Sequence, residues 1–122
     1  MKLKLIFKIL EKDVFPPFFA EHLNLTEKLV EGQDIVLSCT WGGNPATSIQ
    51  WQKDGQVLNN ETPYKVETQN NNSRLLIQSA KKEDQGVFVC LIANSAGSNM
   101  SRCQVLVTCN TLKLINYFKI NL

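Results

Sequence analysis

The chain has 122 residues, which is enough for one domain with a single hydrophobic core. Its apolar fraction of 43% and charged fraction of 20% are ordinary for a globular protein and argue against a disordered or fibrous chain. Residues 16–108 carry seven Lys/Arg and nine Asp/Glu (net −2), whereas the flanks carry six lysines against Glu11 and Asp13 (net +4). The central part therefore lacks the basic patch of a nucleic-acid binder.

The two flanks differ in composition from the centre. No run approaches the roughly 18 consecutive apolar residues of a membrane-spanning helix. Lysines interrupt the first ten residues and leave only Leu5-Ile6-Phe7 uninterrupted, which is shorter than the apolar segment of a signal peptide. We expect residues 1–15 and 109–122 to be disordered or non-native flanks around one domain, residues 16–108.

The domain begins at Pro16-Pro17, because proline lacks a backbone donor and favours an extended neighbour. Short runs of alternating apolar and polar residues follow, separated by turn residues, which is typical of an all-β antiparallel sandwich of seven or eight strands. The inward-facing positions, in chain order, are Ile35, Leu37, Cys39; Ile49, Trp51; Leu75, Ile77; Phe88, Cys90, Ile92; and Cys103, Val105, Val107. Turns are expected at residues 42–45, 53–55, 70–72 and 94–97.

Two cysteines and a tryptophan indicate the fold. Cys39 and Cys90 lie 51 positions apart on inward-facing runs, and Trp51 follows Cys39 by 12 positions. Two sheets about 10 Å apart can be linked by one disulfide with an indole packed beside it, which is the arrangement of the immunoglobulin sandwich. The spacing of the two cysteines alone would also fit two unrelated buried thiols.

The surrounding motifs resemble the I-set of immunoglobulin domains over roughly residues 16–108, and are most similar to the repeats of titin-like muscle filament proteins. The matching segments are Pro16-Pro17-Phe18-Phe19, Glu31-Gly32, Leu37-Ser38-Cys39, Gly43-Asn44-Pro45, Trp51-Gln52-Lys53-Asp54-Gly55, Tyr64, Leu75-Leu76-Ile77, the run Asp84 to Cys90, and Asn94-Ser95-Ala96-Gly97. The resemblance implies a Greek-key sandwich with a Cys39–Cys90 disulfide. The expected structural positions are Leu37, Trp51, Leu75, Ile77, Asp84, Gly86 and Phe88.

One position departs from the family pattern. The family usually has tyrosine two residues before the second cysteine, where its hydroxyl bonds back to the backbone, and this chain has Phe88. We expect the loss of that bond to cost about 1 kcal/mol. Asp84 is expected to stabilise the same corner through Lys65 or Arg74.

Residues that could support catalysis are scarce. The sequence shows no nucleophile beside a base and no metal-ligand spacing, so we expect no enzyme activity, cofactor, metal or small-molecule substrate. His22, the single histidine, is more simply a surface residue. Cys103 shares the inward parity of Val105 and is more simply a buried hydrophobe than half of a second disulfide, and Cys109 has no evident partner.

Two functions remain open, both based on binding other proteins, including neighbouring immunoglobulin-like domains. The resemblance favours a cytoplasmic spacer and interaction module, one repeat of a sarcomeric or cytoskeletal filament protein, in which cysteines could stay reduced. The alternative is a module of an extracellular adhesion protein or receptor. Four N-x-S/T sequons favour it, at Asn24, Asn60, Asn71 and Asn99. Under either function, Leu23–Val30 and Gln104–Thr108 are expected to offer edge-strand pairing.

Overall fold

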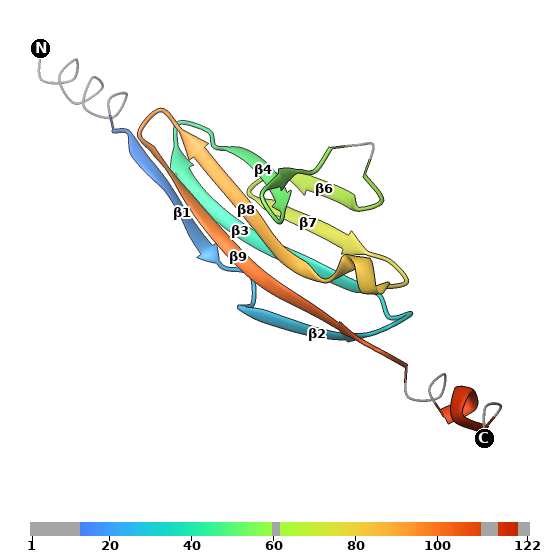
Figure 1. Cartoon of the computed structure of the whole chain (residues 1–122). Coiled ribbons are helices and arrows are strands. Elements are labelled where there is room, and N and C mark those ends of the chain that lie inside the picture. The colour runs from blue at the N-terminus through green and yellow to red at the C-terminus, as the bar shows by residue number, and fades with distance from the viewer. Residues whose placement is uncertain (1–12, 60–61, 111–114, 120–122) are drawn as a thin grey trace, which may run out of the picture.

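The computed structural model describes residues 13–59, 62–110 and 115–119, and its strands form two sheets packed face to face (Figure 1). Among the described residues the elements are β1 (Phe15–Glu21), β2 (Thr26–Val30), β3 (Ile35–Asn44), β4 (Ser48–Lys53), β5 (Gln56–Val57), β6 (Lys65–Gln69), β7 (Asn72–Ile77), the short 3-10 helix η1 (Lys82–Asp84), β8 (Gly86–Asn94) and β9 (Gly97–Thr108). One sheet has the order β1-β3-β7-β6 and the other β2-β9-β8-β4-β5. The expected two-layer sandwich is confirmed.

The interior forms where the inward positions of the two sheets meet. Phe88, Cys90 and Ile92 on β8 are fully buried, as are Leu75 and Ile77 on β7. Because successive side chains of a strand point to opposite faces, the alternation in the sequence identifies these positions directly. The remaining apolar core residues are Phe19, Leu23, Leu29, Leu37, Cys39, Trp41, Trp51, Ala80, Cys103, Val105 and Val107.

The N-terminal part of the chain contributes a strand to each sheet. β1 pairs with β3, and after a short connection β2 pairs in parallel with β9, from Thr26↔Gln104 to Val30↔Thr108. The connection is anchored by the buried Leu23 side chain, and the Leu23 amide donates a 2.9 Å hydrogen bond to Ser101 Oγ on β9. Among the described strands, β2 and β9 thus form the one parallel pair, and the other pairs are antiparallel.

This pairing corrects the expectation that Leu23–Val30 and Gln104–Thr108 both form free edges. The two segments pair with each other, and Gln104 and Val105 also pair with β8 on their other side, so β2 is the edge strand of this sheet. Alternation assigns a strand to a face but does not name the neighbour with which it pairs, which is why the sequence did not reveal this contact.

Strand β3 is longer than predicted, because residues 42–44, expected in a turn, continue to pair with β1. Phe18 lies opposite Gly42, and a Cβ atom on Gly42 would be 2.5 Å from the Phe18 ring. A glycine is thus required for the ring of Phe18 to lie against the strand. Trp41, which was not among the predicted inward-facing positions, continues the alternation of Leu37 and Cys39 and lies in the core with 4% of its surface exposed.

The first strand, β1, starts at Phe15, and the last strand, β9, ends at Thr108. The carbonyl oxygens of Asp13 and Phe15 accept hydrogen bonds from Asn44 (2.6 Å) and Asn94 (2.9 Å). Residues 115–119 are helical. No helix in the described part of the chain is long and apolar enough to cross a membrane.

A chain shortened to residues 16–108 is expected to fold with nearly the stability of the full chain. Among the contacts of the described residues, it loses the exposed hydrogen bonds at Asp13 and Phe15 and the pairing of Phe15 with Asn44, so the free energy of unfolding should fall by less than about 2 kcal/mol. Urea unfolding of both chains measures the difference, and a chain of residues 13–108 should recover most of it. A loss well above 2 kcal/mol would mean that the flanks are part of the fold.

Candidate functional site

Trp51 occupies the centre of the sandwich beside the predicted cysteine pair. Its side chain is 3% exposed, it lies opposite Cys90 in the β4–β8 register, and its Nε1 donates a 2.8 Å hydrogen bond to Ser73 Oγ on the other sheet. Thr68 Oγ1 lies 2.9 Å from the same Ser73 oxygen. The indole therefore links the two sheets by packing and by a buried hydrogen bond.

Cys39 and Cys90 are brought together as the inward parity requires. Their Sγ atoms are 3.1 Å apart, beyond the roughly 2.05 Å of a disulfide bond, so the structure describes two buried thiols in contact. The hydrogen bond with Cys39 and burial both raise the pKa of the Cys90 thiol. Both cysteines are fully buried, so this pair is shielded from alkylating reagents while the domain is folded. The disulfide itself stays a prediction.

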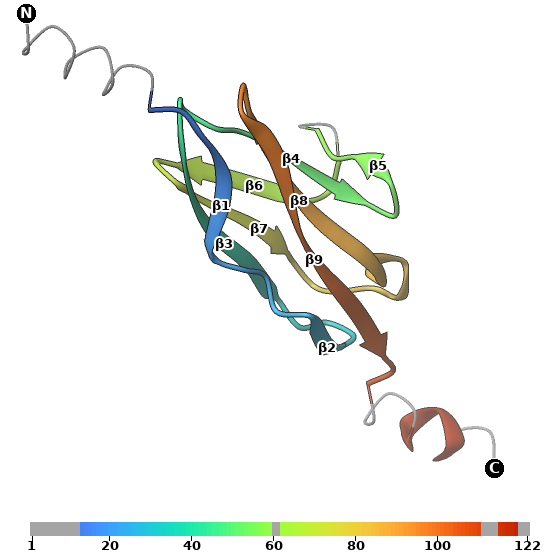
Figure 2. The ribbon, with the colours of Figure 1, turned by 90° about the vertical axis from the view of Figure 1, so that its left-hand side faces the viewer.

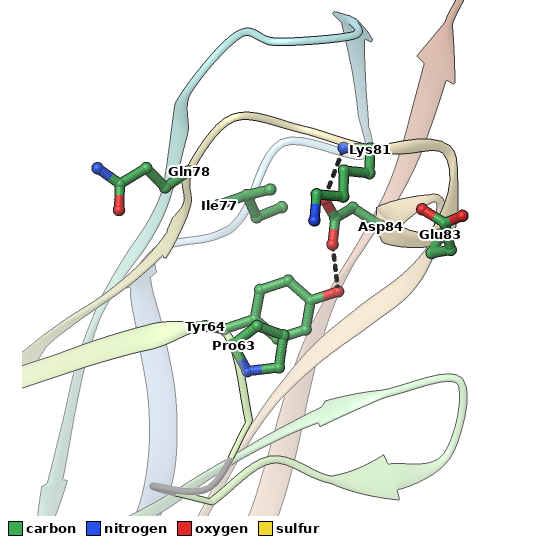
Figure 3. Close-up of a pocket in the computed structure, with 7 residues that line it drawn as sticks. All are labelled: Pro63, Tyr64, Ile77, Gln78, Lys81, Glu83 and Asp84. Atoms are coloured by element: carbon green, nitrogen blue, oxygen red, sulfur yellow. Dashed lines mark hydrogen bonds between the residues drawn. The ribbon is translucent and has the colours of Figure 1, made fainter.

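The corner between η1 and β8 is built differently from the expected one (Figure 3). The Tyr64 hydroxyl donates a 2.8 Å hydrogen bond to Asp84 Oδ1, and the Lys81 amide donates a 2.7 Å bond to Asp84 Oδ2. The Tyr64 ring packs edge-on against Phe88, with centroids 5.4 Å apart. A tyrosine just before β6 thus supplies a hydroxyl to this corner, although residue 88 has none.

The expectation that Asp84 pairs with Lys65 or Arg74 was wrong. Its partners are the Tyr64 hydroxyl and the Lys81 amide. Lys65 and Arg74 both lie on the sheet of β6 and β7, and their register partners Leu76 and Glu67 place them on its outer face, away from Asp84. Tyr64 was noted among the matching residues, but no spacing rule in the sequence connects it with residue 84.

A pocket of about 470 Å³ lies beside this corner and is lined by Pro63, Tyr64, Ile77, Gln78, Lys81, Glu83 and Asp84 (Figure 3). Both oxygens of Asp84 already accept hydrogen bonds from within the domain. His22 lies elsewhere, where it stacks on Phe19 and bonds to Ser101 on β9. The pocket lining does not place a nucleophile beside a histidine base.

Replacing Tyr64 with phenylalanine is expected to lower the free energy of unfolding by about 1 kcal/mol near neutral pH, because Asp84 loses one donor. Burial, and then the hydrogen bond and negative charge of Asp84, raise the pKa of Tyr64. A group whose folded pKa lies above its unfolded value contributes stability below that unfolded value, about 10 for tyrosine, and loses it as the pH rises further. Urea unfolding between about pH 7 and 11 should show a smaller alkaline loss in Tyr64→Phe than in the parent.

A parent and variant with equal alkaline loss would contradict the role of this hydroxyl. Tyr117, on the described helical turn outside the sandwich, offers the matched control. Tyr117→Phe should leave the stability of the sandwich unchanged near neutral pH.

Gly86 meets the turn of residues 53–55. Asp54 adopts a positive φ of 50°, its amide donates to Val87 O, and its Oδ1 accepts a 2.9 Å bond from the Val87 amide. A Cβ atom on Gly86 would be 2.5 Å from Asp54 Oδ2. The glycine therefore leaves room for the carboxylate that fixes this turn on β8.

The structure gives two of the four sequons a structural explanation. Ser73, the third residue of the Asn71 sequon, accepts the Trp51 bond, and Ser101, the third residue of the Asn99 sequon, accepts the Leu23 bond. Ser73 and Ser101 are the two buried polar residues of the described core. Asn24, Asn71 and Asn99 are exposed, and Asn60 lies outside the described residues. The serines serve the fold whether or not a glycan is attached.

The remaining cysteines occupy different environments. Cys103 is fully buried on β9, and burial together with the negative charge of Glu27 raises the pKa of its thiol to about 11. Cys109 is exposed just after β9. Among the described residues, no group of three or more His, Cys, Asp or Glu could hold a metal ion.

Comparison with known proteins places this architecture in a family. Residues 17–107 match the immunoglobulin I-set domain. The chain belongs to the immunoglobulin I-set family. Such domains are typically non-enzymatic modules that occur within longer proteins, some of which contain a kinase elsewhere.

Members of the I-set family with similar sequences come from two kinds of protein. The chain is 36% identical over 80 residues to the titin homolog of Caenorhabditis elegans. The match covers 66% of this chain, but so small a part of that very long protein that the share rounds to 0%. It is 35% identical over 75 residues to neural cell adhesion molecule 1 of Bos taurus, covering 62% of this chain and 9% of that protein. The chain thus spans less than a tenth of these relatives.

A solved I-set structure shows the same fold. The structure of a complex between titin M10 and an obscurin-like 1 Ig domain matches with a TM-score of 0.71 and 28% identity, over 78% of this chain and 96% of that chain. This I-set chain is therefore similar both to repeats of muscle proteins and to domains of adhesion proteins.

Proposed function

We propose that this chain is a non-catalytic protein-interaction and spacer module, one repeat of a larger muscle or cytoskeletal filament-associated protein. The observation that carries the proposal is the use of its polar side chains. The side chain of Asp84 stabilises the corner between η1 and β8. The hydroxyl of Ser73 links the two sheets, and that of Ser101 holds the connection between β1 and β2. These groups stabilise a framework whose sheet faces and edges are left for binding.

The arrangement of the strands suits a spacer. β1 begins at one end of the sandwich and β9 finishes at the opposite end (Figures 1 and 2). The end of β9 is held on one side by β2, and on the other by Gln85, whose side chain accepts from the Val107 amide at 3.1 Å. Lys82 Nζ donates to Val107 O at 3.0 Å. A domain secured at both ends can separate its neighbours along a chain by a defined length.

Two observations support a cytoplasmic location. Since Ser73 and Ser101 serve as buried hydrogen-bond acceptors, their sequons need no explanation by glycosylation. The similarity to the titin homolog favours the filament setting. The complex of titin M10 with an obscurin-like 1 Ig domain supports binding between immunoglobulin domains as the kind of partner to expect.

A second candidate function is an extracellular adhesion or receptor module. It is favoured by the 35% identity to neural cell adhesion molecule 1 and by the exposure of Asn24, Asn71 and Asn99. In that setting the contact between Cys39 and Cys90 would be closed as a disulfide.

Antibody staining of native tissue tests the proposed function. An antibody raised against residues 16–108 should label striated or cytoskeletal filaments, and only after the cells are permeabilised. Preabsorption with the folded chain provides the control. Staining of unpermeabilised cells would contradict the filament assignment and support the adhesion module.

A further inference from the structure

The four outer strands of the two sheets differ in how well they are protected against pairing with another chain. β1 contains Pro16 and Pro17 and two register shifts against β3, and β5 has only two residues. Prolines, irregular register and short length are the usual means of blocking an edge. β2 and β6 each have five residues in unbroken register. The described structure therefore leaves two regular edges, of which β6 is antiparallel to its neighbour.

The β6 edge is distinguished from β2 by an adjoining groove. About 350 Å³ of open space lies between the β6 edge of one sheet and the β4–β5 edge of the other, and its lining includes Trp51, Val57, Leu58, Tyr64, Val66 and Thr68. Val66 pairs with the buried Leu75, so its side chain points toward this groove, yet it remains 41% exposed. Val57, across the groove on β5, is 52% exposed. Apolar side chains thus border the inner side of β6, the edge strand of the described sheet.

The outer side of β6 carries charges instead. Lys65 and Glu67 lie two residues apart, opposite Leu76 and Arg74, on the outer face of the sheet. Every second residue of an edge strand directs its N–H and C=O away from the sheet, and an added strand satisfies this row. Every second side chain of such a strand would enter the groove. The side chains between them would lie on the outer face, beside Lys65 and Glu67.

Resting on the proposed binding function, we propose that the β6 edge binds an extended segment of another protein as an additional antiparallel strand. That segment has an apolar residue opposite Val66, which enters the groove. On the outer face it has a carboxylate opposite Lys65 and a basic residue opposite Glu67, so that both charges meet opposite ones.

A synthetic peptide of this pattern provides the probe. In threonine-valine-lysine-valine-glutamate-valine-threonine, antiparallel pairing sets the central valine opposite Val66, lysine opposite Glu67 and glutamate opposite Lys65. Titrated into the isotope-labelled 122-residue chain, it should shift the amide resonances of residues 65–69 saturably, with a Kd on the order of 0.1–1 mM. A peptide of the same composition with its three valines adjacent should bind at least about tenfold more weakly.

Two variants test the chemistry of the edge. Val66→Lys should weaken binding at least about tenfold, whereas Val36→Lys, at a 49% exposed site on the outer face of the same sheet, should not. Glu67→Lys, at an exposed site, should also weaken binding of the peptide, and exchanging the peptide's lysine for glutamate should restore it.

Absence of shifts at residues 65–69, or equal binding by Val66→Lys, would overturn the proposal. Shifts confined to β2 and β9 would overturn it too, while leaving a protein-binding function in place. Failure of the proposed function would appear separately, as surface staining of unpermeabilised cells.

Discussion

Replacing Trp51 with alanine is expected to lower the free energy of unfolding by about 3–5 kcal/mol. The indole is 3% exposed, lies opposite Cys90 and donates to Ser73 across the sandwich, so its removal leaves a cavity and one hydrogen bond fewer at the buried Ser73 hydroxyl, which keeps its contact with Thr68. Because ordinary domains are stable by only about 5–15 kcal/mol, this loss removes a large share of the stability of the domain. Urea unfolding followed by circular dichroism measures the effect.

Trp51→Phe separates packing from the hydrogen bond. Phenylalanine fills most of the same volume but cannot donate to Ser73, so this variant should lose only about 1–2 kcal/mol. An alanine variant that loses less than about 1 kcal/mol would show that Trp51 is not central to the core.

Oxidation of the Cys39–Cys90 pair is expected to raise the free energy of unfolding by up to about 4 kcal/mol. The two sulfurs are already in contact at 3.1 Å, and a bond between them closes a loop of about 52 residues in the unfolded chain. The reduced chain should still unfold in one cooperative step, because the sixteen buried hydrophobic residues form a continuous core without the bond. Urea unfolding with and without reductant compares the two forms.

A chain with Cys39→Ala is the control and should respond to neither oxidant nor reductant. A reduced chain that shows no cooperative transition would mean that the fold requires the disulfide. That result would favour the oxidising setting of the alternative, extracellular function.

The sequence was most informative where a single periodic rule decides the structure. Alternation assigned Leu37, Ile77 and Phe88 to the interior, where each is at most 3% exposed. It does so because a strand buried on one face has a side-chain period of two. The distance of 12 positions from Cys39 to Trp51 likewise reflects two strands on opposite sheets.

The sequence was least informative about contacts between distant segments. The Tyr64–Asp84 bond joins residues 20 positions apart, and the Ser101–Leu23 bond joins residues 78 apart. Such pairs depend on the angle between the sheets and on the path of each connection, which local patterns do not encode. For the same reason, the structural role of the sequon serines Ser73 and Ser101 became visible only in the folded chain.

The central claim is that this chain is a cytoplasmic filament module that folds without a disulfide or a glycan. Its most direct test uses the protein isolated from native tissue. The protein is unfolded, its thiols are labelled, and its intact mass is measured. The claim predicts that Cys39 and Cys90 both take up label and that no glycan mass is attached to Asn24, Asn60, Asn71 or Asn99. Labelling before unfolding should spare the buried pair and modify Cys109, which confirms that the fold was intact. A disulfide between Cys39 and Cys90 together with a glycan on any of the four asparagines would contradict the claim and assign the chain to an extracellular protein.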